Sequence, residues 1–160
     1  MHKHKFNPEH IERLLGEERR KSLDPAEFLK KEGLKKGGTF ADVGCGPGFF
    51  TLEASQIAGP SGKVYGIDTQ EEMLAELKKR CASPNVIAVK SEEASIPVET
   101  SSVDFALLAC MLHEADEIQL FLKEVKRIVK PGGKILVIDW KKRRERSGPP
   151  QKERLSRAVL

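Results

Sequence analysis

The sequence has few cysteines and no long apolar run, and each of these absences excludes a class of protein. The three cysteines, Cys45, Cys81 and Cys110, are an odd number without a Cys-x-x-Cys spacing. This excludes a disulfide framework and argues against a structural zinc site. No run approaches the roughly 20 apolar residues of a membrane span, and the N-terminus lacks the apolar stretch of a signal peptide. We therefore expect a cytoplasmic protein with reduced thiols.

The composition is that of one globular domain with an acidic body and basic ends. A chain of 160 residues has room for a single core, and 39% hydrophobic residues exclude a fully disordered chain. The net charge of +4 is unevenly distributed, because residues 41–140 carry ten basic and fifteen acidic side chains, whereas residues 141–160 carry eight and two. No aromatic residue follows Trp140 on which a base would stack, so we expect no nucleic-acid partner.

Strand and helix patterns alternate along the chain and predict an α/β fold. Two short helices open it, one over residues 8–21 and one from the Asp24-Pro25 cap to Glu32, with Gly33 as a left-handed C-terminal cap. The predicted strands are 39–43, 63–68, 86–89, 103–110 and 134–140, and the helices between them are 49–58, one that follows a capping box at Thr69, and 116–130. This order predicts a doubly wound, mainly parallel sheet that binds its ligand at the carboxyl ends of the strands.

A glycine loop, Gly44-Cys45-Gly46-Pro47-Gly48, joins the first predicted strand to a helix. Its glycines let the backbone approach a ligand, which indicates an anion or nucleotide site. A dinucleotide fingerprint requires its third glycine one position later, where Phe49 stands, so an NAD-linked oxidoreductase is a disfavoured alternative. Asp68 ends the next strand and is placed to accept ribose hydroxyls.

Four segments in order resemble one known family. They are FADVGCGPGFFTL (40–52), VYGIDTQEEML (64–74), SEEASIPVETSSVDFALLACMLHE (91–114) and KRIVKPGGKILVIDW (126–140). Together they are similar to the class I S-adenosylmethionine-dependent methyltransferases, in the type 11 branch that includes the ubiquinone and menaquinone C-methyltransferases. The resemblance implies a Rossmann-like sheet, S-adenosylmethionine as cofactor and S-adenosylhomocysteine as product.

The resemblance also implies which residues form the cofactor site. The glycine loop and the acid before it would cradle the methionine part, the acid ending the next strand would hold the ribose, and later residues would contact the adenine or line the cleft. The expected residues are Asp42, Gly44, Gly46 and Gly48 for the methionine part, Asp68 for the ribose, Thr69, Glu92 and Glu93 for the adenine, and Ala109 for the cleft wall.

Methyl transfer needs few catalytic groups, because the sulfonium cofactor carries its own leaving group. Alignment of the acceptor for in-line attack contributes roughly 7 to 11 kcal/mol. His113 is a candidate general base for an N, O or acidic C–H nucleophile, and the alternative is a loop histidine without a catalytic role. We expect a methyltransferase acting on a small molecule; an inactive, cofactor-binding partner subunit and a nucleic-acid methyltransferase are the remaining alternatives.

The predicted organisation has three parts. Residues 1–36 form a helical segment that covers the site, residues 37–140 form the cofactor-binding core, and residues 141–160 form a basic C-terminal segment. The last two strands of the family's seven-stranded sheet are not found after Trp140. We expect either a truncated chain or a homodimer that pairs the exposed sheet edge.

Overall fold

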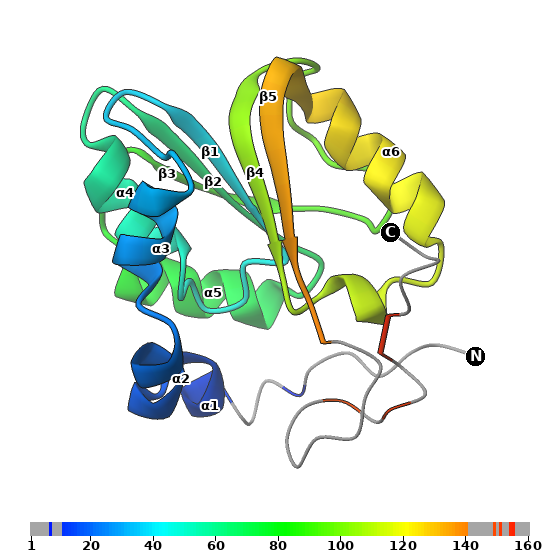
Figure 1. Ribbon diagram of the computed structural model, residues 1–160, viewed down its shortest axis with the longest axis horizontal. Helices are drawn as coiled ribbons and strands as arrows, with labels where there is room; N and C mark the ends of the chain where they lie inside the picture. The colour runs from blue at the N-terminus through cyan, green and yellow to red at the C-terminus, as the bar shows by residue number, and fades with distance from the viewer. Residues whose placement is uncertain (1–6, 8–10, 141–148, 150, 152–153, 156–160) are drawn as a thin grey trace.

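The computed structural model describes Asn7, residues 11–140, Pro149, Gln151, Arg154 and Leu155. The described part contains five strands, six α-helices and a short 3-10 helix (Figure 1). The elements are α1 (Ile11–Leu15), α2 (Glu17–Ser22), α3 (Pro25–Lys31), β1 (Thr39–Val43), α4 (Thr51–Ala58), β2 (Lys63–Asp68), α5 (Glu71–Arg80), β3 (Val86–Lys90), β4 (Val103–Ala109), η2 (Leu112–Glu114), α6 (Ile118–Ile128) and β5 (Val129–Ile138).

The five strands form one parallel sheet in the order β3-β2-β1-β4-β5. The chain starts in the middle of the sheet, winds outward to β3, and then returns to the other side of β1. Asp42 on β1 lies between Gly66 of β2 and Leu107 of β4, so the point where the winding reverses is next to β1. The predicted doubly wound α/β fold is confirmed, and its ligand site is expected at this reversal.

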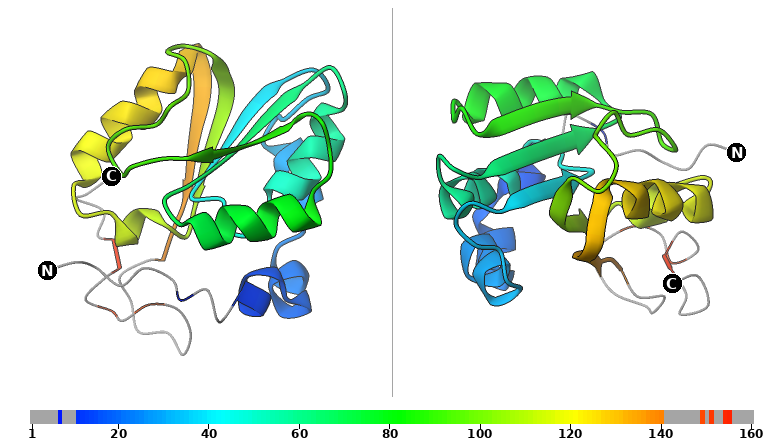
Figure 2. Two further views of the ribbon diagram at one scale, coloured as in Figure 1. Left: turned by 180° about the vertical axis from the view of Figure 1, so that it is seen from behind. Right: turned by 90° about the horizontal axis from the view of Figure 1, so that it is seen from above.

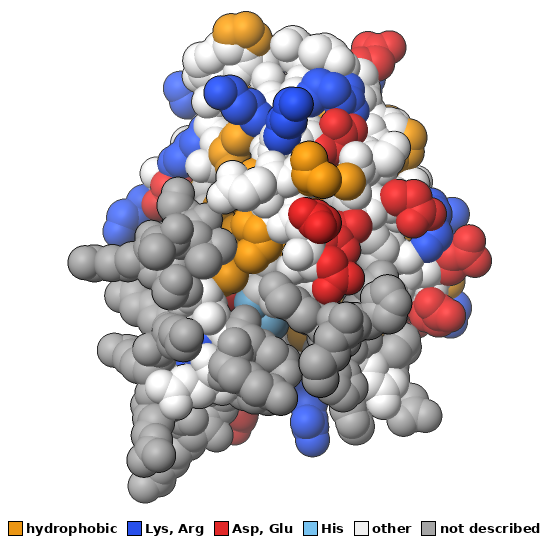
Figure 3. Space-filling view, turned by 90° about the vertical axis from the view of Figure 1, so that its right-hand side faces the viewer, with side chains coloured by type: hydrophobic (Ala, Val, Ile, Leu, Met, Phe, Trp, Pro, Cys, Tyr) orange, Lys and Arg blue, Asp and Glu red, His pale blue; other side chains and the backbone are white. Residues whose placement is uncertain are grey.

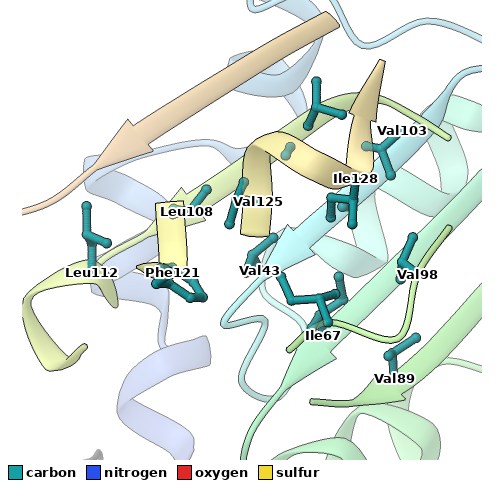
Figure 4. Close-up of a cluster of buried hydrophobic side chains, with 14 of the residues drawn as sticks. Val43, Ile67, Val89, Val98, Val103, Leu108, Leu112, Phe121, Val125 and Ile128 are labelled. Atoms are coloured by element: carbon teal, nitrogen blue, oxygen red, sulfur yellow. The ribbon is translucent and has the colours of Figure 1, made fainter. Parts of the chain in front are cut away.

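Helices cover both faces of the sheet (Figure 2). Phe40, Val64 and Phe105 point to the face that carries α3 and α4, and α5 lies on the same face against β2 and β3. The opposite face packs on α6. Figure 4 shows its side chains, with Val43, Ile67 and Leu108 of the strands against Phe121, Val125 and Ile128 of the helix. Burial on both faces explains the continuous apolar runs of β1 and β4.

The N-terminal helices differ from the prediction in one place. The helix expected over residues 8–21 is two helices, because Gly16 adopts an extended conformation (φ −59°, ψ 154°) and stands as the N-cap of α2. Residues 8–10 lie outside the described residues. The next helix is as predicted: the Asp24 carboxylate accepts the Ala26 and Glu27 N–H groups, and Gly33 ends the helix at φ 101°.

Three other local predictions were wrong. No capping box forms at Thr69, because Gln70 is the N-cap of α5 and its N–H group donates to the carboxylate of Asp68. The helix expected from Phe49 begins at Thr51. The strand expected over 134–140 is Val129–Ile138, and its pairing with β4 shifts between Val103 and Phe105. A bulge of this kind keeps an edge strand in the sheet while its backbone bends.

Most of the predicted basic segment 141–160 lies outside the described residues. Of the part that is described, Leu155 packs into the core on the α6 face, and the Arg154 guanidinium lies 5.5 Å from the centre of the Trp140 ring. No helix in the described part of the chain is long and apolar enough to cross a membrane.

Candidate cofactor site

A cavity of about 110 Å³ opens at the carboxyl ends of β1, β2 and β4. Its lining includes five of the residues expected for the cofactor, together with residues from α2, the glycine loop and the segment after β4. The expected ones are Asp42, Gly44, Gly46, Asp68 and Ala109; the others include Leu14, Arg19, Phe49, Cys110, Met111 and Glu114. The structure thus brings together residues from positions 14 to 114 at the reversal point of the sheet.

Asp68 fixes the shape of the glycine loop. Its carboxylate accepts the Gly46 N–H at 2.9 Å and the Gln70 N–H at 2.9 Å. The N–H groups of Gly44 and Cys45 both donate to the carbonyl oxygen of Ile67, so the loop is tied to the end of β2. Burial raises the pKa of Asp68, and the backbone hydrogen bonds oppose that rise. Each carboxylate oxygen has a further lone pair, so the group can also accept hydroxyl protons from a ligand.

Gly44 permits a close approach of side chain to loop. Its φ is 74°, and a Cβ placed there would lie 2.6 Å from Met111 Cγ. Met111 therefore packs directly on the loop backbone and fills part of the cavity. Only glycine fits at this position without moving Met111.

Asp42 is a buried carboxylate at the bottom of the cavity. It is 2% exposed and accepts a hydrogen bond from the Thr51 hydroxyl at 2.6 Å. Burial raises the pKa of Asp42 to about 6, although the Thr51 hydrogen bond and the charge of Arg19 both lower it. The group therefore carries its negative charge at neutral pH at a cost in free energy, which a cationic ligand would reduce.

Asp42→Asn is expected to stabilise the ligand-free protein near pH 7 and not near pH 4. Because the folded pKa is about 6 and the unfolded value is about 3.9, the folded state binds the proton more tightly, and stability falls as the pH rises from 4 to 6. Asparagine removes that cost and still accepts from Thr51, so we expect a gain of about 1 to 2 kcal/mol at pH 7.5. Urea unfolding at pH 4.0 and 7.5 measures it. An equal gain at both values would contradict a charge effect.

The two thiols of the cavity are not activated. Burial raises the pKa of Cys45 well above its ordinary value, and nearby Asp42 and Asp68 raise it further. Burial also raises the pKa of Cys110, although the charge of Arg19 opposes it. Both side chains stay protonated at neutral pH and act as small packing groups, since a reactive cysteine requires a lowered pKa.

Arg19 of α2 lies in the wall of the cavity. Its guanidinium lies 4.4 Å from the centre of the Phe49 ring and donates a hydrogen bond to the Leu14 carbonyl oxygen at 2.9 Å. Burial lowers the pKa of Arg19, and the negative charge of Asp42 opposes that shift. Among the described residues around the cavity, Arg19 is the only basic one. Helical periodicity of α2 alone gives no sign of this, because the contact depends on how α2 docks.

Four of the expected cofactor residues lie outside the cavity lining. Gly48 faces α5, where a Cβ would lie 2.5 Å from Leu77 Cδ1. The carboxylate of Glu93 accepts the N–H groups of Asp116 and Glu117 at the start of α6. Glu92 is exposed and its backbone pairs with Ser95, and the Thr69 carbonyl oxygen accepts a hydrogen bond from Lys90. The cofactor roles of Gly48, Thr69, Glu92 and Glu93 remain predictions.

His113 forms a buried pair with Asp139, a residue that sequence reasoning missed. His113 Nδ1 lies 2.7 Å from Asp139 Oδ1, and the His113 backbone N–H donates to Asp139 Oδ2 at 3.2 Å. The Trp140 N–H also donates to this carboxylate. His113 Nε2 lies 3.9 Å from a carboxylate oxygen of Glu114, which lines the cavity. The sequence signal was an acid near the end of the last predicted strand, at the edge where the site forms.

The donor set of this cavity fits S-adenosylmethionine. Asp42, Asp68 and Glu114 supply negative charge for a ligand with a sulfonium and an ammonium group, and Arg19 supplies one cation for its carboxylate. The glycine loop borders the same cavity, and Asp68 holds its backbone there through the Gly46 N–H. These are the features that a polar, zwitterionic nucleoside needs.

Comparison with known proteins agrees with this geometry. A model of the methyltransferase domain family matches residues 41–137. The chain is 36% identical over 112 residues to a demethylmenaquinone methyltransferase of Staphylococcus aureus, a match that covers 69% of this chain and 46% of the relative. The chain thus spans about half the length of the curated relatives that it matches.

Solved structures extend the match over most of the chain. An S-adenosylmethionine-dependent methyltransferase of Aquifex aeolicus superposes with a TM-score of 0.89 at 42% identity, over 95% of this chain and 82% of that protein. A type 11 methyltransferase of Sulfolobus solfataricus superposes with a TM-score of 0.71 at 35% identity, over 84% and 75%. The chain therefore belongs to the type 11 family of S-adenosylmethionine-dependent methyltransferases, and its cofactor is S-adenosylmethionine.

Proposed function

We propose that the protein transfers a methyl group from S-adenosylmethionine to a small-molecule acceptor by in-line displacement. The observation that carries the proposal is the cavity at the sheet reversal, where Asp68 holds the glycine loop and three acidic side chains gather around one arginine. The similarity to the demethylmenaquinone methyltransferase of Staphylococcus aureus favours a quinone-type ring, taken in its hydroquinone form, as the acceptor of this protein. Such a ring is apolar and carries hydroxyl protons.

Five residues of the cavity have a proposed part in the transfer. When bound, the cofactor supplies the activated methyl group. Asp68 accepts the ribose hydroxyls while it holds the loop through Gly46, and Asp42 offsets the positive charge of the cofactor. Phe49 and Met111 present apolar surface that excludes water from the site. Exclusion of water strengthens these charge interactions and protects the methyl donor.

Asp68→Ala tests the cofactor site. Loss of the carboxylate removes the ribose acceptor and releases the Gly46 N–H, so we expect S-adenosylhomocysteine to bind roughly tenfold to a hundredfold more weakly, as charge-assisted hydrogen bonds contribute about 1.5–3 kcal/mol. Isothermal titration calorimetry measures the affinity. Asp104→Ala is the matched control, since Asp104 lies near the start of β4, bonded to Thr39 and Lys130. Absence of binding to the unmodified protein would contradict the proposed function.

We further propose that His113 is the general base, with Asp139 as its positioning residue. The carboxylate of Asp139 accepts the Nδ1 proton, which leaves Nε2 as the acceptor atom on the side of Glu114. His113 is 6% exposed, and Figure 3 shows part of a histidine side chain at the surface; His113 is the only histidine that the structure describes. An inactive partner subunit would bind cofactor without transferring the methyl group, so labelled transfer to a quinol separates the two.

A further inference from the structure

We propose that Arg19 binds the α-carboxylate of the cofactor and thereby holds the helix pair α1–α2 closed over the loaded site. The inference rests on the proposed cofactor site and goes beyond it, because it assigns α1–α2 a ligand-dependent position. It makes closure depend on one chemical group of the ligand, the carboxylate.

The charges around the cavity make Arg19 the partner for the cofactor carboxylate. Asp42, Asp68 and Glu114 are acids, so the cofactor carboxylate has one positive partner among the described lining residues, Arg19. The guanidinium lies 4.4 Å from the centre of the Phe49 ring, a cation–π contact that takes up none of its N–H groups. A planar, preorganised guanidinium pairs with a carboxylate through two parallel hydrogen bonds.

The helices α1 and α2 have few contacts with the body of the protein. Neither helix has a buried residue. Besides the Arg19 contact with Phe49, the ion pairs that tie them to the body among the described residues are Arg20–Glu53 at 3.2 Å and Glu12–Arg80 at 3.1 Å, and the Glu12 side chain is 86% exposed. Leu15 adds a partly buried apolar contact with the core. Surface ion pairs contribute little to stability. The helix pair therefore docks weakly, and a ligand contact made by α2 has a large effect on its position.

The cavity is small for a ligand of the size of the cofactor. Its volume of about 110 Å³ is well below the roughly 300–1,000 Å³ of ligand pockets. Leu14 contributes to this closure, since its Cδ1 lies 3.6 Å from where a Cβ of Gly46 would stand. The cofactor needs Leu14 to move. Arg19 then exchanges the Leu14 carbonyl oxygen, its present acceptor, for the incoming carboxylate.

A pair of ligands isolates the carboxylate. S-adenosylhomocysteine carries it, and its decarboxylated amine retains the adenosine, the sulfur and the ammonium group. Calorimetry with the unmodified protein should show the amine binding about tenfold to a hundredfold more weakly. In Arg19→Gln the affinity for S-adenosylhomocysteine should fall to that of the amine, and the amine should bind as it does to the unmodified protein. Arg20→Gln is the matched control, since it removes an ion pair of the same helix outside the cavity lining.

Hydrogen exchange of residues 11–22 reports closure. S-adenosylhomocysteine should slow exchange in these residues, the amine should not, and Arg19→Gln should abolish the difference. Equal affinity of both ligands for the unmodified protein would overturn the inference, as would carboxylate-dependent binding that survives Arg19→Gln. Absence of binding by either ligand would overturn the proposed function itself. If Arg19 instead serves an acidic acceptor, Arg19→Gln leaves both affinities unchanged, and the inference fails while the cofactor site stands.

Discussion

Gly48→Ala is expected to lower the free energy of unfolding by about 3 kcal/mol, although Gly48 lies outside the cavity lining. The residue has φ 99°, where an L side chain is strained by about 1–2 kcal/mol. A Cβ would also lie 2.5 Å from Leu77 Cδ1. Leu77 is fully buried, and its other methyl group lies 2.5 Å from where a Cβ of Gly66 would stand, so the side chain is packed against the backbone on that side as well. Overpacking of this kind costs about 1–3 kcal/mol.

Two further variants separate the strain from the clash. Gly33 has a similar φ of 101° and nothing within 4 Å of its virtual Cβ, so Gly33→Ala should cost only about 1 kcal/mol. In Gly48→Ala/Leu77→Ala the clash is removed, and the double variant should be less destabilised than the sum of the two single variants. Urea unfolding of the unmodified protein, the three single variants and the double variant measures this. Additive effects, or equal costs at Gly33 and Gly48, would contradict the packing explanation.

The glycines of the loop have two different structural roles, so the loop pattern was only partly informative about function. Gly44 and Gly46 line the cavity, whereas Gly48 and Gly66 let Leu77 of α5 approach the sheet. A glycine pattern records close backbone approach, and the approaching group is a ligand in one case and a leucine in the other. The sequence does not distinguish these two causes.

The succession of strands and helices along the chain was predictable, because each element has a local signal in the sequence. The apolar run of β4 and the alternation of strands with helices required a parallel sheet covered on both faces. The bounds that failed depended on competition between nearby groups. Thr69 was expected to cap α5, and Asp68 bonds the Gln70 N–H instead. At Gly16 the expected amphipathic helix is divided into two helices, and the polar–apolar pattern does not indicate this break.

Some residues of the candidate site were predictable from the sequence and others were not. Asp42 and Asp68 were predictable, since each stands at or near the end of a strand where parallel sheets bind ligands. Arg19 and Asp139 were not, because each reaches the site from an element whose docking is a tertiary property. Glu93 shows the converse: it was expected at the adenine with its neighbour Glu92, and its carboxylate bonds the start of α6 in the structure.

His113→Asn is expected to lower kcat for a hydroquinone acceptor by about a hundredfold or more, the usual contribution of a positioned general base. Asparagine places an amide N–H near the position of Nδ1, so the bond to Asp139 is kept while the basic Nε2 is lost. Initial rates of methyl transfer from labelled S-adenosylmethionine to the hydroquinone measure kcat of the unmodified protein and of the variant.

Asp139→Asn separates positioning from catalysis. An amide does not stabilise the positive charge that the imidazole gains when it takes the proton of the acceptor, so kcat with the hydroquinone should fall by about tenfold. A thiol acceptor ionises without help, so its methylation should be little affected by His113→Asn. S-adenosylhomocysteine affinity and unfolding free energy of both variants serve as controls. Equal losses with both acceptors would show that the pair only ties η2 to the end of β5, because a structural bond affects every acceptor alike.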